Sequence, residues 1–182
     1  MKRGVTLAEV LLTSSLTLLV LALVVPLYKT MRQILTTTQL TQLLQTESLT
    51  VSQRLRSDYL TARPGSLVVG PGLISFLSYR EGLSSWDERG QIVWRKWIQY
   101  RYQSPRLERR EILLRPPSTT PVGDPPPWPS RERGATLARY LSRFEARVIG
   151  STLEVTFTSS SQGQISASQI SLLPQLYGSD SL

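Results

Sequence analysis

The feature that most constrains this chain is an uncharged, apolar run near its N-terminus, from Val10 to Tyr28. The run is 19 residues long, and a helix needs roughly 20 residues to cross a hydrocarbon core about 30 Å thick. Lys2 and Arg3 precede it, and basic residues that flank a membrane helix favour the cytoplasmic side. The sequence therefore predicts a membrane helix whose N-terminus is cytoplasmic.

Three other interpretations of this run have to be weighed. A secretory signal peptide has an apolar core of only about 7–15 residues and a small-residue cleavage site after it, whereas Val24 to Tyr28 is a poor site of that kind. A plain signal anchor fits the hydropathy. A buried core helix fits less well at this length and position.

Glu9 helps to separate these alternatives because it lies at the edge of the apolar run. A carboxylate in a membrane segment costs a few kcal/mol at the centre and less towards an end. A simple anchor has no use for it. The residue therefore predicts a positively charged partner, such as the free N-terminal amine of a neighbouring subunit.

The residues Gly4-Val5-Thr6-Leu7-Ala8-Glu9 resemble the processing signal of type IV prepilins and pseudopilins. That signal is a short basic leader ending in glycine, followed by an apolar residue, often Thr-Leu, and a glutamate five places after the cut. Pro26 lies where such pilins carry a helix-kinking proline. Val5 replaces the usual phenylalanine and Ala8 a larger aliphatic residue, and both remain apolar.

The resemblance implies a sequence of events for the N-terminus. A prepilin peptidase would cleave between Gly4 and Val5 on the cytoplasmic side, and the new Val5 amine would be N-methylated. Removing Lys2 and Arg3 would lower the formal charge from +8 to +6, by subtraction of two basic residues. Glu9 would then pair with the Val5 amine of an adjacent subunit, so Glu9→Ala should still insert in the membrane but fail to join a pilus.

The resemblance also implies a location and a set of partners. The protein would be a single-pass protein of the inner (cytoplasmic) membrane. It would later be extracted from the membrane into a filament in the periplasm or at the cell surface. Its partners would be the prepilin peptidase, other pilins or pseudopilins, the inner-membrane assembly platform and membrane lipid.

Helical spacing continues beyond the apolar run. Leu40, Leu44, Val51 and Leu55 share one helical face, which Leu43 widens. We expect one helix from about Val5 to Ala62, bent or locally opened at Pro26 and ended by Arg63-Pro64-Gly65. The expected divisions are a leader (1–4), a transmembrane and polymerisation helix (5–28), its amphipathic continuation (29–63) and a β-rich globular domain (64–182).

The pattern beyond Pro64 changes to alternation, which predicts strands. The strands expected are residues 73–79, 92–102 and 106–114, two strands around Phe144 and Val155 joined by a tight turn at Gly150-Ser151, and a last strand over 165–173, with a frayed tail at 178–182. Gly82 to Gly90 is expected as a loop that contains Trp86, and Gly70-Pro71-Gly72 as a turn. Residues 116–129 hold seven prolines and predict a stiff surface loop without regular pairing. Ala135 to Ser142 is expected as a short helix.

This layout is an α+β fold, a long N-terminal helix packed on an antiparallel sheet, and it is similar to that of pilins. The size and the run of strands resemble the larger minor pilins of the PilW kind and the J pseudopilins of type II secretion. The chain has no cysteine, so its last hairpin has to rely on packing rather than on a disulfide.

Basic and aromatic side chains are interleaved in the expected sheet. Between Arg80 and Arg115 there are nine basic and five acidic residues, and single-strand nucleic-acid binders combine positive charge with aromatic stacking. The competing interpretation is that the aromatic residues are core and the arginines form a solvated outer face. The candidate DNA contacts are Arg95, Lys96, Trp97, Arg101, Arg109 and Arg110.

The composition gives no support to catalysis. Without cysteine and histidine, Ser-His-Asp and Cys-His chemistry and Cys/His zinc sites are excluded. The carboxylates of Asp87, Glu88, Glu108 and Glu111 have no recognisable partner in the sequence and are expected as loop and strand-surface charges. We therefore expect no enzyme activity, no cofactor and no metal.

The leading functional hypothesis is a minor pilin or pseudopilin that helps to initiate or cap a pilus-like filament. A DNA-uptake component of such a machine and a signal-anchored envelope protein that never polymerises are the alternatives. The sequence does not distinguish motility, adhesion, secretion and transformation.

Overall fold

The structure is a computed structural model that describes residues 6–63, 65–79, 87–119, 123–129, 133–150 and 152–173. Several sequence predictions lie outside these residues: the leader with Gly4 and Val5, Pro64, Trp86, Ser151 and the tail at 178–182. The chain divides into two compact units, Met1–Gln42 and Leu43–Leu182, and each is described by itself.

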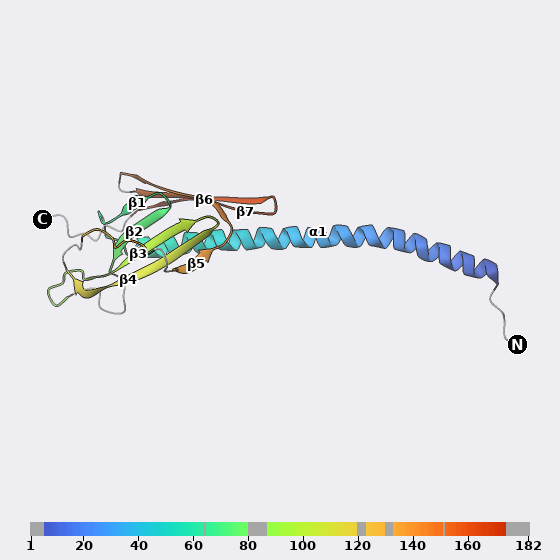
Figure 1. Cartoon of the computed structure of the whole chain (residues 1–182), viewed down its shortest axis with the longest axis horizontal. Coiled ribbons are helices and arrows are strands. Elements are labelled where there is room, and N and C mark those ends of the chain that lie inside the picture. Colours follow the sequence, from blue (N-terminus) through green and yellow to red (C-terminus); the bar gives the residue numbers. More distant parts are fainter. Residues whose placement is uncertain are drawn as a thin grey trace. The chain divides into compact units, whose positions relative to one another are not determined.

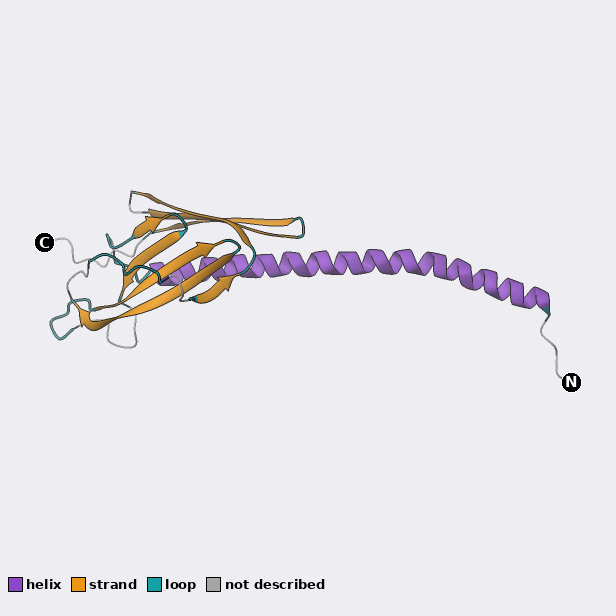
Figure 2. Ribbon diagram, in the orientation of Figure 1, coloured by secondary structure: helices purple, strands orange, loops and turns teal. Residues whose placement is uncertain are grey.

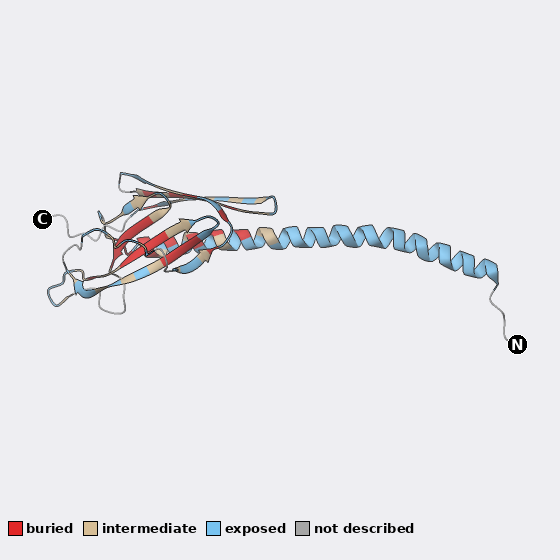
Figure 3. Cartoon of the chain, in the orientation of Figure 1, coloured by how far each residue is buried: buried red, intermediate tan, exposed pale blue. Residues whose placement is uncertain are grey.

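Helix α1 (Leu7–Tyr59) supplies the first unit and the start of the second (Figures 1 and 2). The helix continues through Pro26, although a proline has no N–H to donate to the carbonyl of residue 22. All residues from Thr6 to Gln39 are exposed, as the uniformly pale blue part of the helix in Figure 3 shows.

The second unit holds two antiparallel sheets that begin after α1 ends. The five-stranded sheet has the order β1-β2-β3-β4-β5 and the three-stranded sheet the order β6-β7-β8. The strands are β1 (Val68–Gly70), β2 (Leu73–Ser78), β3 (Trp94–Gln103), β4 (Arg106–Ser118), β5 (Ala135–Ala138), β6 (Leu141–Ile149), β7 (Thr152–Ser161) and β8 (Gln164–Leu172). The α+β arrangement of a long helix packed on antiparallel sheets is therefore confirmed.

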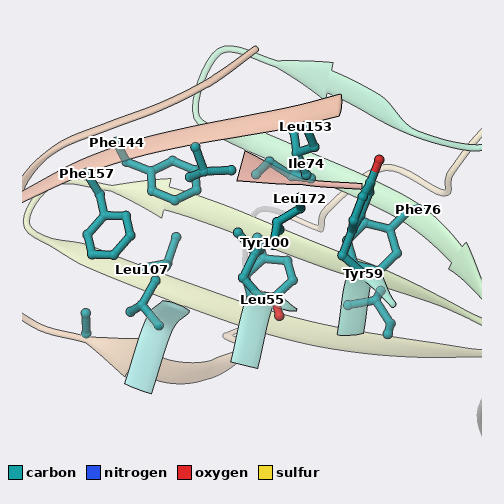
Figure 4. Close-up of a cluster of buried hydrophobic side chains, with 14 of the residues drawn as sticks. Leu55, Tyr59, Ile74, Phe76, Tyr100, Leu107, Phe144, Leu153, Phe157 and Leu172 are labelled. Carbon is teal, nitrogen blue, oxygen red and sulfur yellow. The ribbon is translucent and has the colours of Figure 1, made fainter. Parts of the chain in front are cut away.

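The main core lies between the last part of α1 and the two sheets (Figure 4). Leu55 from α1, Phe76 from β2, Tyr100 from β3 and Phe157 from β7 are all fully buried in it. Both sheets and the helix thus contribute large apolar side chains to one cluster. At roughly 1.5–3 kcal/mol for each fully buried large side chain, this cluster is the main source of stability in the second unit.

A smaller apolar cluster of Leu77, Trp94 and Trp97 joins β2 and β3. The register between β3 and β4 shifts near Trp94, which pairs with Ser118, whereas Lys96 pairs with Leu113, so the extra residues of this irregularity lie on β4. A bulge of this kind bends the strands locally. The alternation expected over 92–102 is correct for Ile98, Tyr100 and Tyr102, which face the main core, and wrong for Trp94, which clusters with Trp97.

The predicted turns between strands are found where the chain is described. Ser104 and Pro105 join β3 to β4, with Gln103 paired to Arg106. Pro71 and Gly72 join β1 to β2, with Gly70 paired to Leu73. Gly72 has a φ of 66°, and a Cβ there would lie 3.1 Å from the Tyr102 carbonyl oxygen, so this turn needs glycine.

Two predictions about secondary structure are wrong. Ala135–Ala138 is strand β5 and Leu141 already belongs to β6, because pairing of Ala135 with Arg109 outweighs the weak helix preference of an alanine- and leucine-containing segment. Pro116 and Pro117 lie inside β4 rather than in a loop. Beyond Arg109, β4 has no pairing with β5, and prolines are tolerated on such an open edge.

The predicted apolar stripe of α1 is correct for Leu44, Val51 and Leu55 and wrong for Leu43. Leu43 is 42% exposed. The buried face of α1 includes two polar residues, Ser48 and Asp58. The helix ends at Tyr59 rather than at Ala62. The buried face of α1 thus carries one carboxylate, that of Asp58.

Candidate functional sites

The first candidate site is the start of α1, where Glu9 and Thr6 hold each other. The Glu9 carboxylate accepts hydrogen bonds from the Thr6 backbone N–H at 3.0 Å and from the Thr6 hydroxyl at 3.1 Å. The Glu9 N–H donates to the Thr6 hydroxyl oxygen at 3.4 Å. This reciprocal arrangement is a capping box, which satisfies amide groups that a helix start leaves without partners. The sequence predicted only a charge partner for Glu9, although the Thr-x-x-Glu spacing also signals this second role.

The apolar run after Glu9 presents its side chains on every side of the helix. Leu11, Leu19 and Leu23 are 62%, 62% and 66% exposed. The most apolar 18-residue stretch of α1 has a mean hydropathy of 2.5 and none of it is buried. Helix α1 is thus long and apolar enough to cross a membrane. An exposed apolar surface of this extent calls for lipid or for other protein to cover it.

The serine and threonine side chains within the run are satisfied by the helix itself. The Thr13 hydroxyl donates to the Glu9 carbonyl at 2.7 Å and the Thr17 hydroxyl to the Thr13 carbonyl at 2.7 Å. Ser14 and Ser15 donate to carbonyls three residues earlier. Such back-bonding removes the cost of placing hydroxyl groups in an apolar environment.

The second candidate site is a charge network at the end of α1 that the sequence analysis did not anticipate. Asp58, 7% exposed, accepts two hydrogen bonds from the Arg109 guanidinium and one from the Tyr100 hydroxyl at 2.6 Å. Glu111 accepts hydrogen bonds from Arg109 and from Lys96, the latter at 2.8 Å. The network joins α1, β3 and β4, so it fixes the helix at one position on the sheet.

The charges of this network hold its titratable groups in one protonation state. Burial raises the pKa of Tyr100 well above its ordinary value, and the Asp58 carboxylate acts in the same direction. Burial alone would lower the pKa of Arg109, but hydrogen bonds and attraction from Asp58 and Glu111 raise it. Burial alone would raise the pKa of Glu111, but Lys96 and Arg109 lower it. The carboxylate of Glu111 and the guanidinium of Arg109 therefore stay charged, and the Tyr100 phenol stays neutral, at neutral pH.

The predicted nucleic-acid contacts do not share one face of the sheet. Lys96 and Arg109 point towards α1 and are held by Glu111 and Asp58. Trp97 is 2% exposed in the smaller apolar cluster. Arg95 is half-buried.

The remaining two predicted contacts, Arg101 and Arg110, lie on the face away from α1 and are covered there. Arg101 donates to Glu108 and Arg110 to Gln99, both at 2.8 Å. The Trp128 ring packs against both guanidinium groups, at 4.4 Å and 4.9 Å, which is the geometry of a cation–π contact.

The proline-rich segment therefore forms a lid over this face of the sheet. Besides Trp128, the Pro126 carbonyl accepts a hydrogen bond from Gln99 at 2.8 Å and the Pro127 carbonyl one from Arg110 at 3.3 Å. Gly134 is needed beside it, because a Cβ there would lie 2.5 Å from the Arg109 carbonyl oxygen and 3.0 Å from Trp128. The solvated outer face expected for these arginines is thus wrong, and nucleic-acid binding by them stays a prediction.

Glu108, expected as a strand-surface charge, is buried, whereas Glu111 is exposed on β4 as expected, and both have partners that the sequence did not reveal. Glu108 is 6% exposed and ion-paired with Arg101 at 2.8 Å. Glu111 belongs to the network of Asp58. Within the described ranges, no three His, Cys, Asp or Glu side chains gather in a way that could hold a metal ion.

Comparison with known proteins gives no relative from which a function can be transferred. No protein family, no curated protein and no solved structure matches the chain. The functional argument therefore rests on the residues and on their geometry.

Proposed function

We propose that this protein is a minor type IV pilin or pseudopilin, a structural subunit that helps to initiate, prime or cap a pilus-like filament. The observation that carries the proposal is the combination of Glu9 with a fully exposed apolar helix. A leader with Gly4 before the cut and Glu9 after it precedes that helix. The protein is proposed as a subunit, not as an enzyme.

The exposed apolar run supports a protein with two environments. Lipid covers such a helix in a membrane, and other apolar helices cover it in the core of a filament, since both remove apolar area from water. The hydroxyl groups of Thr13 and Thr17 are already satisfied by the helix, so neither environment leaves them unpaired. The proposed location is the inner membrane, with the N-terminus cytoplasmic, before transfer to the filament.

The position of Glu9 supports a role for its charge in assembly. Thr6 holds the Glu9 carboxylate at the first turn of α1. Thr6 itself directly follows Val5, where cleavage would create a new amine. An amine from a neighbouring subunit at that level would meet a carboxylate that is already oriented. A pair of this kind in an apolar bundle contributes only if both charges are present, because a lone buried charge is strongly destabilising.

The second unit supports a minor subunit rather than an abundant one. Its two sheets and its proline-rich lid over Arg101 and Arg110 make a large head on the helix. The proposed partners are a prepilin peptidase, other pilins or pseudopilins and the inner-membrane assembly platform.

Processing by a prepilin peptidase tests this proposal against a non-polymerising signal anchor. The full chain should be co-expressed with the peptidase and its intact mass measured. We expect loss of residues 1–4 and one added methyl group on Val5. A Gly4→Leu variant and a catalytically inactive peptidase are the matched controls, and both should leave the chain uncut. A full-length product with the active enzyme would favour the plain anchor.

A further inference from the structure

The two sheets described have four edge strands, β1, β5, β6 and β8, and three of them are protected. β1 has only three residues and β5 only four. β6 carries Arg143, Glu145 and Arg147, and its register shifts between Leu141 and Arg143. Short strands, charges and bulges are the usual means by which proteins prevent a sheet edge from pairing with another chain.

The fourth edge, β8, has none of these protections. It is nine residues long. Its pairing with β7 runs without any register shift from Gln164, opposite Ser161, to Leu172, opposite Leu153. No charged residue occurs from Val155 to Ser179, and the nearest proline is Pro174, beyond the strand. A long, flat, uncharged edge presents a row of backbone N–H and C=O groups that an additional strand can use.

A pocket adjoins this edge at its Leu172 end. It has a volume of about 320 Å³ and is lined by Arg56 and Tyr59 of α1, by Leu60 just after the helix, by residues 170–172 of β8 and by Leu173 just after that strand. Leu60 and Leu173 are 41% and 65% exposed, so the mouth of the pocket is apolar. No residue of β7 lines it among those described, which places it on the open side of β8.

Arg56 gives this pocket a charge preference. Its side chain is exposed and forms no ion pair with any described residue. By contrast Arg54, two residues earlier, is paired with Asp58 and Glu111. A ligand that enters the pocket beside Arg56 gains from a carboxylate and loses from an ammonium group.

We propose that the free edge of β8 accepts an extended segment of another filament subunit as a fourth strand of its sheet. That segment places an apolar side chain in the pocket beside Tyr59 and Leu172 and a carboxylate against Arg56. The identity of the partner as a filament subunit rests on the proposed function, whereas the strand addition does not.

A second copy of this chain is a poorer occupant than a different subunit. In a symmetric antiparallel pairing of two β8 strands, the Leu172 end of one copy faces the Gln164 end of the other. Residues 161–168 contain no carboxylate, so such a pair leaves Arg56 without its partner. The charge at the pocket therefore favours an acidic segment from another protein.

Binding of defined peptide probes to the full chain in phosphatidylcholine nanodiscs tests the proposal. The probes are blocked ten-residue peptides of alternating valine and threonine with one glutamate near either end. Control probes carry lysine in place of glutamate, or proline at every second position. We expect saturable binding of a glutamate probe by fluorescence anisotropy, together with slower hydrogen exchange of the amides in 164–172.

Variants of the chain then locate the binding. Arg56→Glu should weaken the glutamate probe about tenfold or more and strengthen the lysine probe, whereas Arg106→Glu, with the same change of net charge, should alter neither. Ala167→Lys, at an exposed position of β8, should weaken both through the charge it places on the edge.

Four results would overturn the inference. The first three are the absence of probe binding, equal binding of the proline control, and binding that Arg56→Glu leaves unchanged. The fourth is binding that appears only after residues 174–182 are removed, which would make the chain's own C-terminus the occupant. A disulfide-linked dimer of Ala167→Cys, in a chain without other cysteines, would instead identify a second copy. Cleavage after Gly4 is measured separately, so failure here leaves the proposed function standing.

Discussion

Asp58 connects α1 to the five-stranded sheet through side chains that are far away in the sequence. Its carboxylate accepts hydrogen bonds from Tyr100 and from Arg109, 42 and 51 residues later. All three side chains are buried. An ion pair of this kind adds little net stability compared with an apolar replacement, but removing one member leaves an uncompensated buried charge.

Replacing Asp58 by alanine should therefore destabilise the second unit strongly. We expect a loss of about 3–5 kcal/mol in the free energy of unfolding, because Arg109 would remain buried without its counter-charge. The measurement is urea unfolding of the full chain in detergent, monitored by tryptophan fluorescence. Glu145→Gln, which breaks an exposed pair with Arg143, is the control and should cost less than about 1 kcal/mol.

The double variant Asp58→Ala with Arg109→Met separates lost charge balance from lost packing. It should be more stable than Asp58→Ala alone, since no unpaired charge remains. If the double variant is as unstable as the sum of the two single variants, the network does not act as a coupled unit.

Glu111 predicts how stability depends on pH. Lys96 and Arg109 lower the pKa of Glu111 in the folded protein, so the unfolded state binds its proton more readily. The stabilising contribution is present above the ordinary glutamate pKa of about 4.3 and is lost as pH falls through the lower folded pKa. Unfolding free energies measured from pH 7 to pH 3 should fall in the acidic range, and less so for Glu111→Gln. Identical pH profiles for the two proteins would contradict this assignment.

The sequence predicted residues whose signal is local and missed those whose signal is distant. Glu9 could be singled out because Gly4, Thr6 and the apolar run lie beside it. Asp58 could not, since its partners lie on two strands whose pairing with α1 has no sequence signature. The partners of Glu111 were missed for the same reason.

At the scale of the elements, alternation of apolar residues was enough for β6, β7 and β8. It failed for β1 and β5, which have three and four residues, because such short strands carry too few positions for a pattern. The sequence also did not predict that the proline-rich segment covers the sheet. The contacts of Trp128 with Arg101 and Arg110 depend on long-range packing, which has no local signal.

The inward face of α1 can be tested with a matched pair of leucines. Leu55 is 0% exposed and Leu43 is 42% exposed. Leu55→Ala should lower the free energy of unfolding by about 2–5 kcal/mol through lost burial and a cavity, and Leu43→Ala by less than about 1 kcal/mol. Urea unfolding of the full chain measures both, and equal losses would mean that the helix is placed wrongly on the sheets.

Gly134 offers a similar test of the lid over the five-stranded sheet. Gly134→Ala forces a Cβ against the Arg109 carbonyl and should cost about 1–3 kcal/mol through overpacking. Gly123→Ala is the control, because nothing lies within 4 Å of a Cβ at that position. Hydrogen exchange of the Trp128 amide should become faster in the first variant alone, and unchanged exchange would argue against the lid.

At the scale of the whole molecule, the chain combines a head that buries its apolar residues with a helix that exposes them. The exposed stretch has a mean hydropathy of 2.5, whereas the head places Leu55, Phe76 and Tyr100 in a closed core. Membrane and filament are two ways of covering the same helix surface. The central claim of our proposal is that Glu9 directs the transfer from the first to the second.

The capping box makes Glu9→Gln the variant that tests this claim most directly. Glutamine can replace glutamate at this position of a capping box, so the start of α1 is kept while the charge is lost; Glu9→Ala loses both. The measurement is the amount of each protein in the membrane and in sheared filaments of cells that express the whole assembly machinery. We predict that Glu9→Gln inserts in the membrane like the unaltered chain and is absent from filaments, as is Glu9→Ala. Incorporation of Glu9→Gln at the level of the unaltered chain would contradict the claim.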